Sequence, residues 1–219
     1  MSAHNTSKEI RRLVLRELDP ETPVVAFDLD EVLWNVNYAY VEEINKAMGT
    51  NFVLEDLKVY NMTEATGVPL EVFHNILHNT DAFARVVPCE FARELIQGIR
   101  DGSLCSYFGL ESRPHKVVFI THRGYRPDGA KVTFDLLKEH DLLPDELVVA
   151  PLGSSKVIIA DDFYGEYMTL MFEDHPHTIN DFLMSGFPVV RSCRPWNRDV
   201  WADYVIDLNQ SSIPRPATV

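Results

Sequence analysis

Acidic side chains that could do chemistry stand close together near the beginning of the chain. Asp28 and Asp30 follow a short apolar run, 24–27, which is entered through Pro23. A run this short that ends in charge predicts a buried parallel strand with an exposed carboxyl end. Side chains two residues apart on an extended chain share one side, and such like charges need a cation or a shared proton. The pair alone is equally typical of a turn that ends a strand.

Further polar side chains follow later apolar runs. Thr121 ends one such run, and Glu173 with Asp174 ends another, while Lys156 stands at the beginning of a predicted helix. Because open α/β sheets bind their ligands at the carboxyl ends of the strands, we expect these groups to converge there. Carboxylates, a hydroxyl and an ammonium group are suited to phosphoryl transfer, which depends mainly on positioning and on charge stabilisation.

Short apolar runs alternate with helical patterns along the second half of the chain. This alternation predicts an α/β fold, a Rossmann-like parallel sheet with right-handed crossovers. Before the first strand, residues 9–18 are spaced as in a short amphipathic helix. Asp128 and Ser154 are the expected capping residues of two helices. The later strands are expected near residues 116–121, 147–150, 168–172, 187–190 and 204–208.

A long, mostly helical stretch separates the first two predicted strands. Apolar residues recur there at helical spacing after Trp34, after Pro69 and again up to Arg100. The distance from the first strand to the second is far greater than a crossover needs. We therefore expect a core formed by residues 1–33 and 115–219, and a helical cap formed by residues 34–114.

Composition limits the classes of function. The chain has 219 residues with 33 acidic and 20 basic side chains, a formal charge of −13. This excess of acids argues against a long nucleic-acid track, which needs clustered Lys and Arg. No apolar stretch reaches the length of a membrane span, and residues 1–20 lack the apolar block of a signal peptide. Three cysteines without zinc or disulfide spacing favour a reducing compartment, so we expect a cytoplasmic protein.

Taken in order, the polar residues resemble the motifs of the haloacid dehalogenase (HAD) superfamily of phosphohydrolases. The resemblance covers the predicted core and implies that Asp28 is the nucleophile that forms an aspartyl phosphate. It also implies that Asp30 is the general acid and base. The matching residues are Asp28-x-Asp30-x-Val32, Thr121, Lys156 and Glu173-Asp174.

The same resemblance implies a magnesium ion and a phosphate site. Mg²⁺ would be held by the Asp28 carboxylate, the Asp30 backbone carbonyl and Asp174. Thr121 and Lys156 would bind phosphate oxygens. Arg123 could also contact the phosphate, or it could pair with acids instead.

Within the superfamily, the chain is most similar to 5′(3′)-deoxyribonucleotidases. The similarity lies in the helical cap and in the segments Glu173-Asp174-His175-Pro176 and Arg194-Pro195-Trp196-Asn197. It implies a small phosphorylated substrate, a nucleoside or deoxynucleoside 5′-monophosphate. The base-stacking aromatic residue of that group has no direct counterpart, because Trp34 is offset and Val36 lies nearer the expected place. Trp34, Tyr38 and Tyr40 could line a base pocket or pack within the cap.

Two alternatives remain open at this point. The substrate could be another small phosphate ester or a nucleic-acid end. Alternatively, the chain could be a catalytically silent binding module, because Glu31 stands where the family usually has glycine and could change the loop beside the nucleophile. The retained polar set, Asp28 through Asp174, favours activity.

Other chemically suggestive residues have simpler interpretations. Asp161 and Asp162 follow Lys156 too closely to be the last motif, and we expect a solvated helix end. His74 and His78 lie four residues apart on a predicted helix, but no third ligand stands at a metal-binding spacing. We expect them to be surface or cap histidines.

Overall fold

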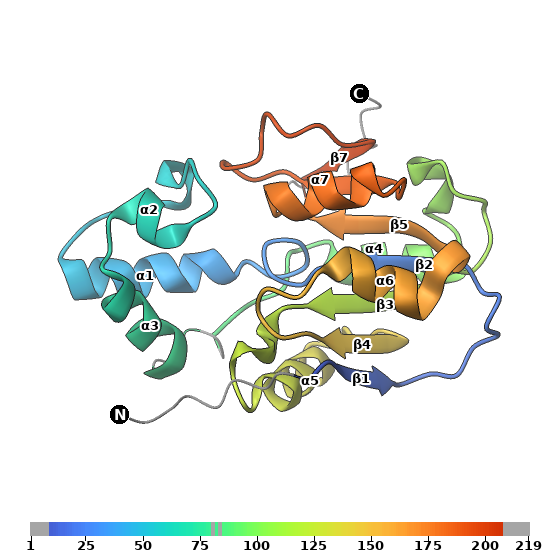
Figure 1. The fold of residues 1–219 in the computed structure, drawn as a ribbon, viewed down its shortest axis with the longest axis horizontal. Coiled ribbons are helices and arrows are strands. Elements are labelled where there is room, and N and C mark those ends of the chain that lie inside the picture. Colours follow the sequence, from blue (N-terminus) through green and yellow to red (C-terminus); the bar gives the residue numbers. More distant parts are fainter. Residues whose placement is uncertain (1–8, 80–81, 83–84, 208–219) are drawn as a thin grey trace.

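A seven-stranded sheet forms the centre of the molecule. The computed structural model describes residues 9–79, 82 and 85–207, and the strands follow the order β1-β4-β3-β2-β5-β6-β7 (Figure 1). β1 is antiparallel to β4, and every other neighbouring pair is parallel. The predicted α/β class with a Rossmann-like sheet is confirmed. The strands are β1 (Arg11–Val14), β2 (Val24–Phe27), β3 (Lys116–Thr121), β4 (Glu146–Val149), β5 (Met168–Glu173), β6 (Val189–Ser192) and β7 (Tyr204–Ile206).

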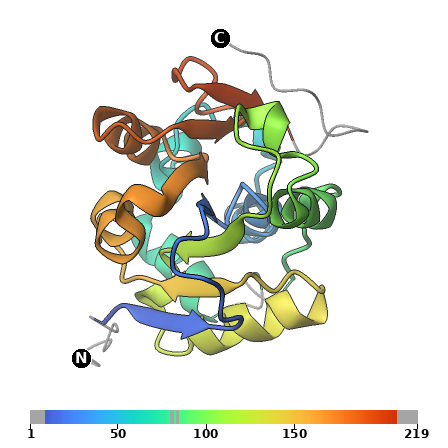
Figure 2. The same ribbon diagram turned by 90° about the vertical axis from the view of Figure 1, so that its right-hand side faces the viewer.

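Helices cover both faces of this sheet. Figure 2 shows α4 (Ala92–Asp101) and α5 (Gly129–Glu139) on one face, and α6 (Lys156–Tyr164) and α7 (Pro176–Met184) on the other. The side chains of β2 alternate between two apolar clusters. Phe27 joins the cluster of α4 and α5, whereas Ala26 joins that of α6 and α7. Burial on both faces explains why this strand is an uninterrupted apolar run.

The remaining helices lie beyond the carboxyl ends of the parallel strands (Figure 1). They are α1 (Val36–Met48), α2 (Met62–Thr66) and α3 (Leu70–Asn79), with the 3₁₀ turn η1 (Leu54–Asp56) between α1 and α2. α1 packs against α3 and η1, whereas α4 packs against β3. The division into a core and a cap stays a prediction, and the packing of α4 favours a cap that ends before this helix.

The prediction of a helix at residues 9–18 is wrong. Residues Arg11–Val14 form β1, an edge strand that pairs with β4. All four side chains are exposed, so burial supplied no alternating pattern to distinguish the strand from a helix. The backbone gains ladder hydrogen bonds from β4, and Arg12 pairs with the buried Glu146. Tertiary contacts therefore decide the conformation of this segment.

Other element boundaries differ by one or two residues. The cap of α6 is Ser155, whose Oγ accepts a hydrogen bond from the Ile158 amide, and not Ser154. Asp128 precedes α5 as expected, but its side chain makes no capping hydrogen bond in the described structure. The strand expected at 187–190 is β6 at Val189–Ser192. The outer parts of the expected core, 1–8 and 208–219, and the last residue of the strand expected at 204–208 lie outside the described residues.

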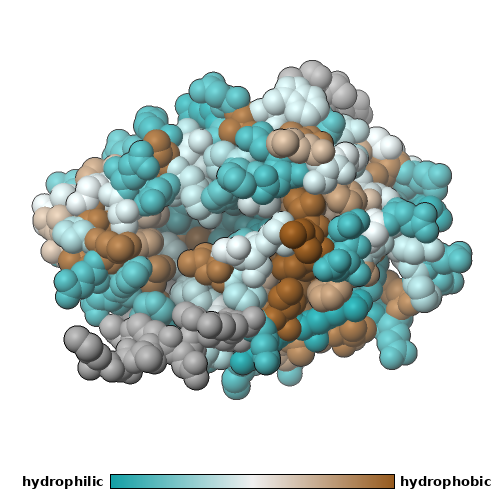
Figure 3. Space-filling model, in the orientation of Figure 1, coloured by the Kyte–Doolittle hydropathy of each residue, from teal (hydrophilic) through white to brown (hydrophobic). Residues whose placement is uncertain are grey.

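The surface shown in Figure 3 is mostly hydrophilic. A strip of apolar side chains crosses it in the region where Figure 1 places the beginning of α6. Leu152, shortly before this helix, and Ile158 within it are both exposed. None of the described helices combines the length and apolar character that crossing a membrane requires.

Candidate active site

A tight turn after β2 presents the first aspartate. The Asp28 amide donates to the Phe172 carbonyl on β5, which extends the sheet pairing by one residue. The Leu29 carbonyl then accepts hydrogen bonds from three successive amides, those of Val32, Leu33 and Trp34. This closed turn holds Asp28 at the carboxyl edge of the sheet, where its residue is only 8% exposed.

Lys156 contacts the nucleophile candidate directly. Its Nζ lies 2.9 Å from Asp28 Oδ1 and 2.8 Å from Glu173 Oε2. Burial raises the pKa of Asp28 to about 7, with Lys156 opposing and Glu173 adding to the shift. Burial also disfavours the charge of Lys156, but the two carboxylates outweigh it and raise the pKa of the ammonium group. A permanent positive charge therefore stands beside Asp28.

Three buried acids form a cluster that suits a metal ion. One oxygen each of Asp28, Glu173 and Asp174 lie within 4.8 Å of one another. Burial, together with Glu173 and Asp28, raises the pKa of Asp174 well above its usual range, because negative charge is unfavourable in this cluster. A divalent cation would relieve it, and carboxylate oxygens are the ligands that Mg²⁺ prefers. The residues therefore fit the ion that the family resemblance implies.

The neighbours of these acids indicate which of them are available. Glu173 uses Oε2 for Lys156 and Oε1 for the amides of Asp174 and His175. Its role is therefore to hold Lys156 and the end of β5, a role that sequence interpretation missed. Asp174 is itself held by Trp196, whose Nε1 donates to Oδ2 at 3.1 Å, and by Asn197, whose Nδ2 donates to the backbone carbonyl.

The side chain of Asp30 is not part of the acid cluster and pairs with Arg123 instead. Arg123, in the 3₁₀ turn η4 (Arg123–Tyr125) after β3, donates through Nε to both Asp30 oxygens at 3.1 and 3.0 Å, and Nη2 also contacts Oδ1. The guanidinium lies 5.8 Å from the ring centre of the buried Trp34. Arg123 thus pairs with the acid/base candidate, and its contact with a phosphate stays a prediction.

Thr121 reaches the same edge of the sheet. It is the last residue of β3, which neighbours β2, and only 1% of it is exposed. Its backbone carbonyl accepts a hydrogen bond from the Ala150 amide. The sheet therefore places Asp28, Thr121 and Asp174 at one edge, as the strand ends predicted, and Lys156 of α6 contacts Asp28 there. Their chemical roles stay predictions.

A cleft of about 1160 Å³ lies between the carboxyl edge of the sheet and helices α1 to α3. Its floor includes Asp30 and Asp174, and no Lys or Arg is among the described residues that line it. Aromatic and histidine side chains form much of its wall. They are Tyr40, Tyr60, Phe73, His74, His78, His122, Tyr125 and His175.

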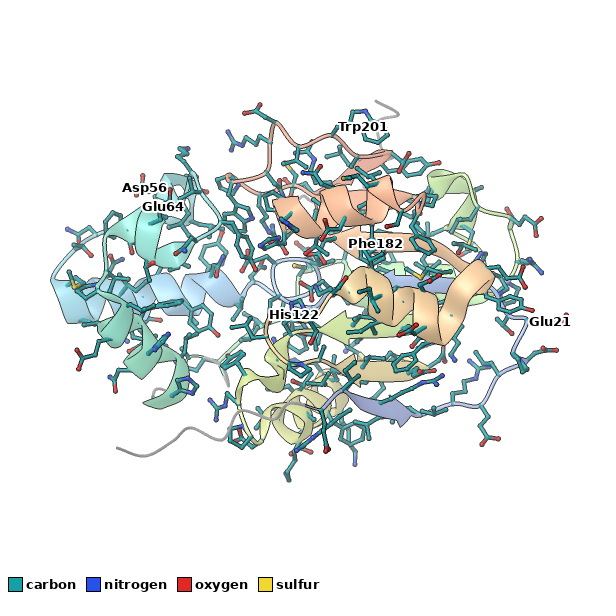
Figure 4. The ribbon with its side chains drawn as sticks, in the orientation of Figure 1. Glu21, Asp56, Glu64, His122, Phe182 and Trp201 are labelled. Carbon is teal, nitrogen blue, oxygen red and sulfur yellow. The ribbon has the colours of Figure 1, made fainter. Side chains whose placement is uncertain are left out.

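Several of these wall residues contact one another. The rings of Tyr60 and His175 are 3.9 Å apart, and the hydroxyls of Tyr40 and Tyr125 are 3.4 Å apart. His122 lies at the end of β3, between the sheet and helices α1 and α3 (Figure 4). Its Nε2 donates to the Ser154 carbonyl, and burial together with Lys156 lowers its pKa to about 4.

The other sequence candidates divide clearly. Trp34 is fully buried and Tyr38 is 54% exposed, and neither lines the cleft, whereas Val36 and Tyr40 do. His74 and His78 belong to the wall, and the only metal-competent cluster found among the described residues excludes them. Asp161 and Asp162 are exposed on α6, as expected for a solvated helix end. Tyr60 was missed because its place depends on how the chain between α1 and α2 folds.

Comparisons with known proteins identify the fold. No protein-family model matches the chain, and no curated protein matches its sequence. Among solved structures, the chain is similar to a "predicted phosphoglycolate phosphatase" from Haemophilus somnus 129PT, with a TM-score of 0.55, 13% identity and coverage of 86% of this chain and 96% of that one. The chain is also similar to a HAD-superfamily hydrolase of subfamily IA from Geobacter sulfurreducens PCA, with a TM-score of 0.51 and 15% identity. The match covers 86% of this chain and 94% of that one. A haloacid dehalogenase-like hydrolase from Streptococcus pneumoniae matches with a TM-score of 0.51 and 10% identity, over 84% of this chain and 93% of that one.

Proposed function

We propose that the protein, which has the fold of the HAD-superfamily hydrolases, is a Mg²⁺-dependent phosphomonoesterase. The observation that carries this proposal is the contact between Asp28 and Lys156 beside Asp174, a residue that lines the cleft. A carboxylate paired with a fixed cation, in a fold shared with phosphatases, is suited to attack on phosphorus.

The reaction proceeds in two steps at these residues. In the first step, an Asp28 carboxylate oxygen bonds to phosphorus while the ester oxygen leaves with a proton from Asp30. In the second step, Asp30 takes a proton from water, and this water attacks the aspartyl phosphate and releases phosphate from Asp28. Lys156 and Thr121 bind phosphate oxygens and offset their charge. Asp28, the Asp30 backbone carbonyl and Asp174 would hold Mg²⁺, which would supply further charge neutralisation.

The preferred substrate in this proposal is a nucleoside or deoxynucleoside 5′-monophosphate. Aromatic wall residues such as Tyr40, Tyr60 and Phe73 offer planar surfaces on which a base can stack. The described lining has no Lys or Arg, so a leaving group with a second anionic group finds no counter-charge there. This disfavours bisphosphates and phosphorylated acids relative to nucleosides, which are neutral.

Phosphate release from a substrate panel tests the proposal. The panel comprises nucleoside and deoxynucleoside monophosphates, sugar phosphates, phosphoglycolate, an aryl phosphate and a 3′-phosphorylated oligonucleotide, each with Mg²⁺ and with EDTA. We expect metal-dependent release concentrated on the mononucleotides and abolished by Asp28→Asn. Release concentrated on another ester would discard the nucleotide substrate, and release by Asp28→Asn would remove the proposed nucleophile.

A further inference from the structure

Glu31 has a backbone conformation that side chains rarely adopt. Its φ is +61°, and among the described residues only Asp141 shares a positive φ without being glycine. A side chain is strained in this region, which explains why glycine is the usual occupant of such a turn. Asp141 is exposed, but Glu31 is only 2% exposed. Burial of a strained, charged side chain requires contacts that compensate for both.

The first compensating contact is with helix α1. Glu31 Oε1 accepts a hydrogen bond of 2.6 Å from the Asn37 amide in the first turn of α1. The described helix has no acid of its own in that turn, and the side chain of its N-cap residue, Asn35, makes no capping bond. Glu31 therefore supplies the hydrogen-bond acceptor that this helix N-terminus needs, and its ionised form also adds a favourable negative charge there.

The second contact is with Arg194, beyond the end of β6. Glu31 Oε2 lies 3.1 Å from Arg194 Nε, and both side chains are almost fully buried. Arg194 Nε also donates to the Glu31 backbone carbonyl at 2.8 Å, as does Ser192 Oγ at 2.9 Å. Arg194 Nη2 reaches Asn35 Oδ1 at 3.3 Å. The core, the Asp30 turn and the start of α1 thus meet at one side chain.

We propose that Glu31 is a positioning residue, a strut that fixes helix α1 and the turn bearing Asp30 against Arg194 of the core. In a turn with glycine at this place, the backbone is free to pivot between core and cap. Here the carboxylate replaces that freedom with two buried contacts. The effect on catalysis rests on the proposed function, whereas the effect on α1 does not.

Glycine substitution gives a test with opposite expected signs at two positions. Asp141→Gly relieves strain at an exposed site and should leave the melting temperature unchanged or raise it. Glu31→Gly also relieves strain but removes the strut, and should lower the melting temperature and speed amide exchange in α1 at least tenfold, with β2 and β3 unchanged. A Glu31→Gly protein that behaves like Asp141→Gly would overturn the proposal.

Milder variants cover the case in which Glu31→Gly does not fold. Glu31→Gln keeps the acceptor for Asn37 but loses the charge facing Arg194, and Arg194→Gln loses the partner. We expect each to lower kcat about tenfold with KM within about twofold, and the double variant to equal either single variant. Additive losses, or unchanged kcat with faster α1 exchange, would refute the positioning role. If the wild type releases no phosphate, the proposed function fails, and the exchange experiment still decides on the strut.

Discussion

At the scale of single residues, Lys156 offsets the charge of two buried carboxylates. It is the cation in contact with both Asp28 and Glu173, and all three are buried. Replacing it by Met leaves two carboxylates facing each other without a counter-charge. We expect Lys156→Met to abolish phosphate release and to reduce the free energy of unfolding by about 3 kcal/mol, measured by urea denaturation without metal.

An exposed lysine provides the matched control for that substitution. Lys131 pairs with Asp135 one turn along α5, and its side chain is 79% exposed. Lys131→Met should leave the free energy of unfolding close to that of the wild type, because an exposed ion pair contributes little. Equal effects of the two substitutions would mean that the Asp28–Lys156 contact contributes no more than a surface pair.

His122 should make stability sensitive to acid. Its pKa is lowered to about 4 by burial and Lys156, whereas an unfolded histidine titrates near the usual 6.5. Between these values the unfolded chain binds more protons than the folded one, so stability falls as the pH decreases from about 6.5 to 4. Unfolding measured without metal at pH 8 and pH 5 should show that His122→Gln removes up to about 2 kcal/mol of this loss.

Only the difference between wild type and His122→Gln isolates this effect. Asp28 has a raised pKa and therefore contributes the opposite pH dependence, because the folded state holds its proton more tightly. Glutamine retains a donor that can reach the Ser154 carbonyl. An identical pH dependence in the two proteins would contradict the lowered pKa of His122.

At the scale of elements, β1 is held by a buried charge on its partner strand. Glu146 of β4 is fully buried and pairs with Arg12 of β1. Its carboxylate also accepts hydrogen bonds from Lys116 Nζ at 2.6 Å and from the Tyr164 hydroxyl at 2.9 Å. Glu146→Ala leaves these donors unpaired and should cost about 3 kcal/mol in thermal or urea unfolding. Arg12→Ala should cost less than about 1 kcal/mol, because Arg12 is 40% exposed. If Arg12→Ala lowered the free energy of unfolding more than Glu146→Ala does, the proposed importance of the buried Glu146 charge would be contradicted.

The elements that sequence could predict are those whose pattern reflects their own burial. β2 and β3 are apolar throughout because helices cover both faces of the sheet, and their ends were placed correctly. β1 was mistaken for a helix because its exposed residues carry no such pattern. α4 has a helical pattern, but sequence could not show that it packs against β3.

At the scale of the whole molecule, topology explains which parts of the site could be predicted. Parallel strands end at one edge, so Asp28, Thr121 and Asp174 had to converge once the strands were recognised. Pairings between side chains were not predictable in this way. The ion pairs Arg123–Asp30 and Arg194–Glu31 depend on the conformations of loops, which no periodic sequence pattern predicts.

Metal binding should stabilise the molecule as a whole, because the acid cluster exists only in the folded chain. A ligand bound only by the folded state adds about 3 kcal/mol at a hundred times its Kd, which corresponds to about 5–10 °C in the Tm of a chain of this size. We expect Mg²⁺ to raise Tm saturably in the wild type. Asp174→Asn should abolish this shift while Asp162→Asn, an exposed acid on α6, retains it. A shift that survives Asp174→Asn would place the ion elsewhere, since general salt effects do not distinguish these two acids.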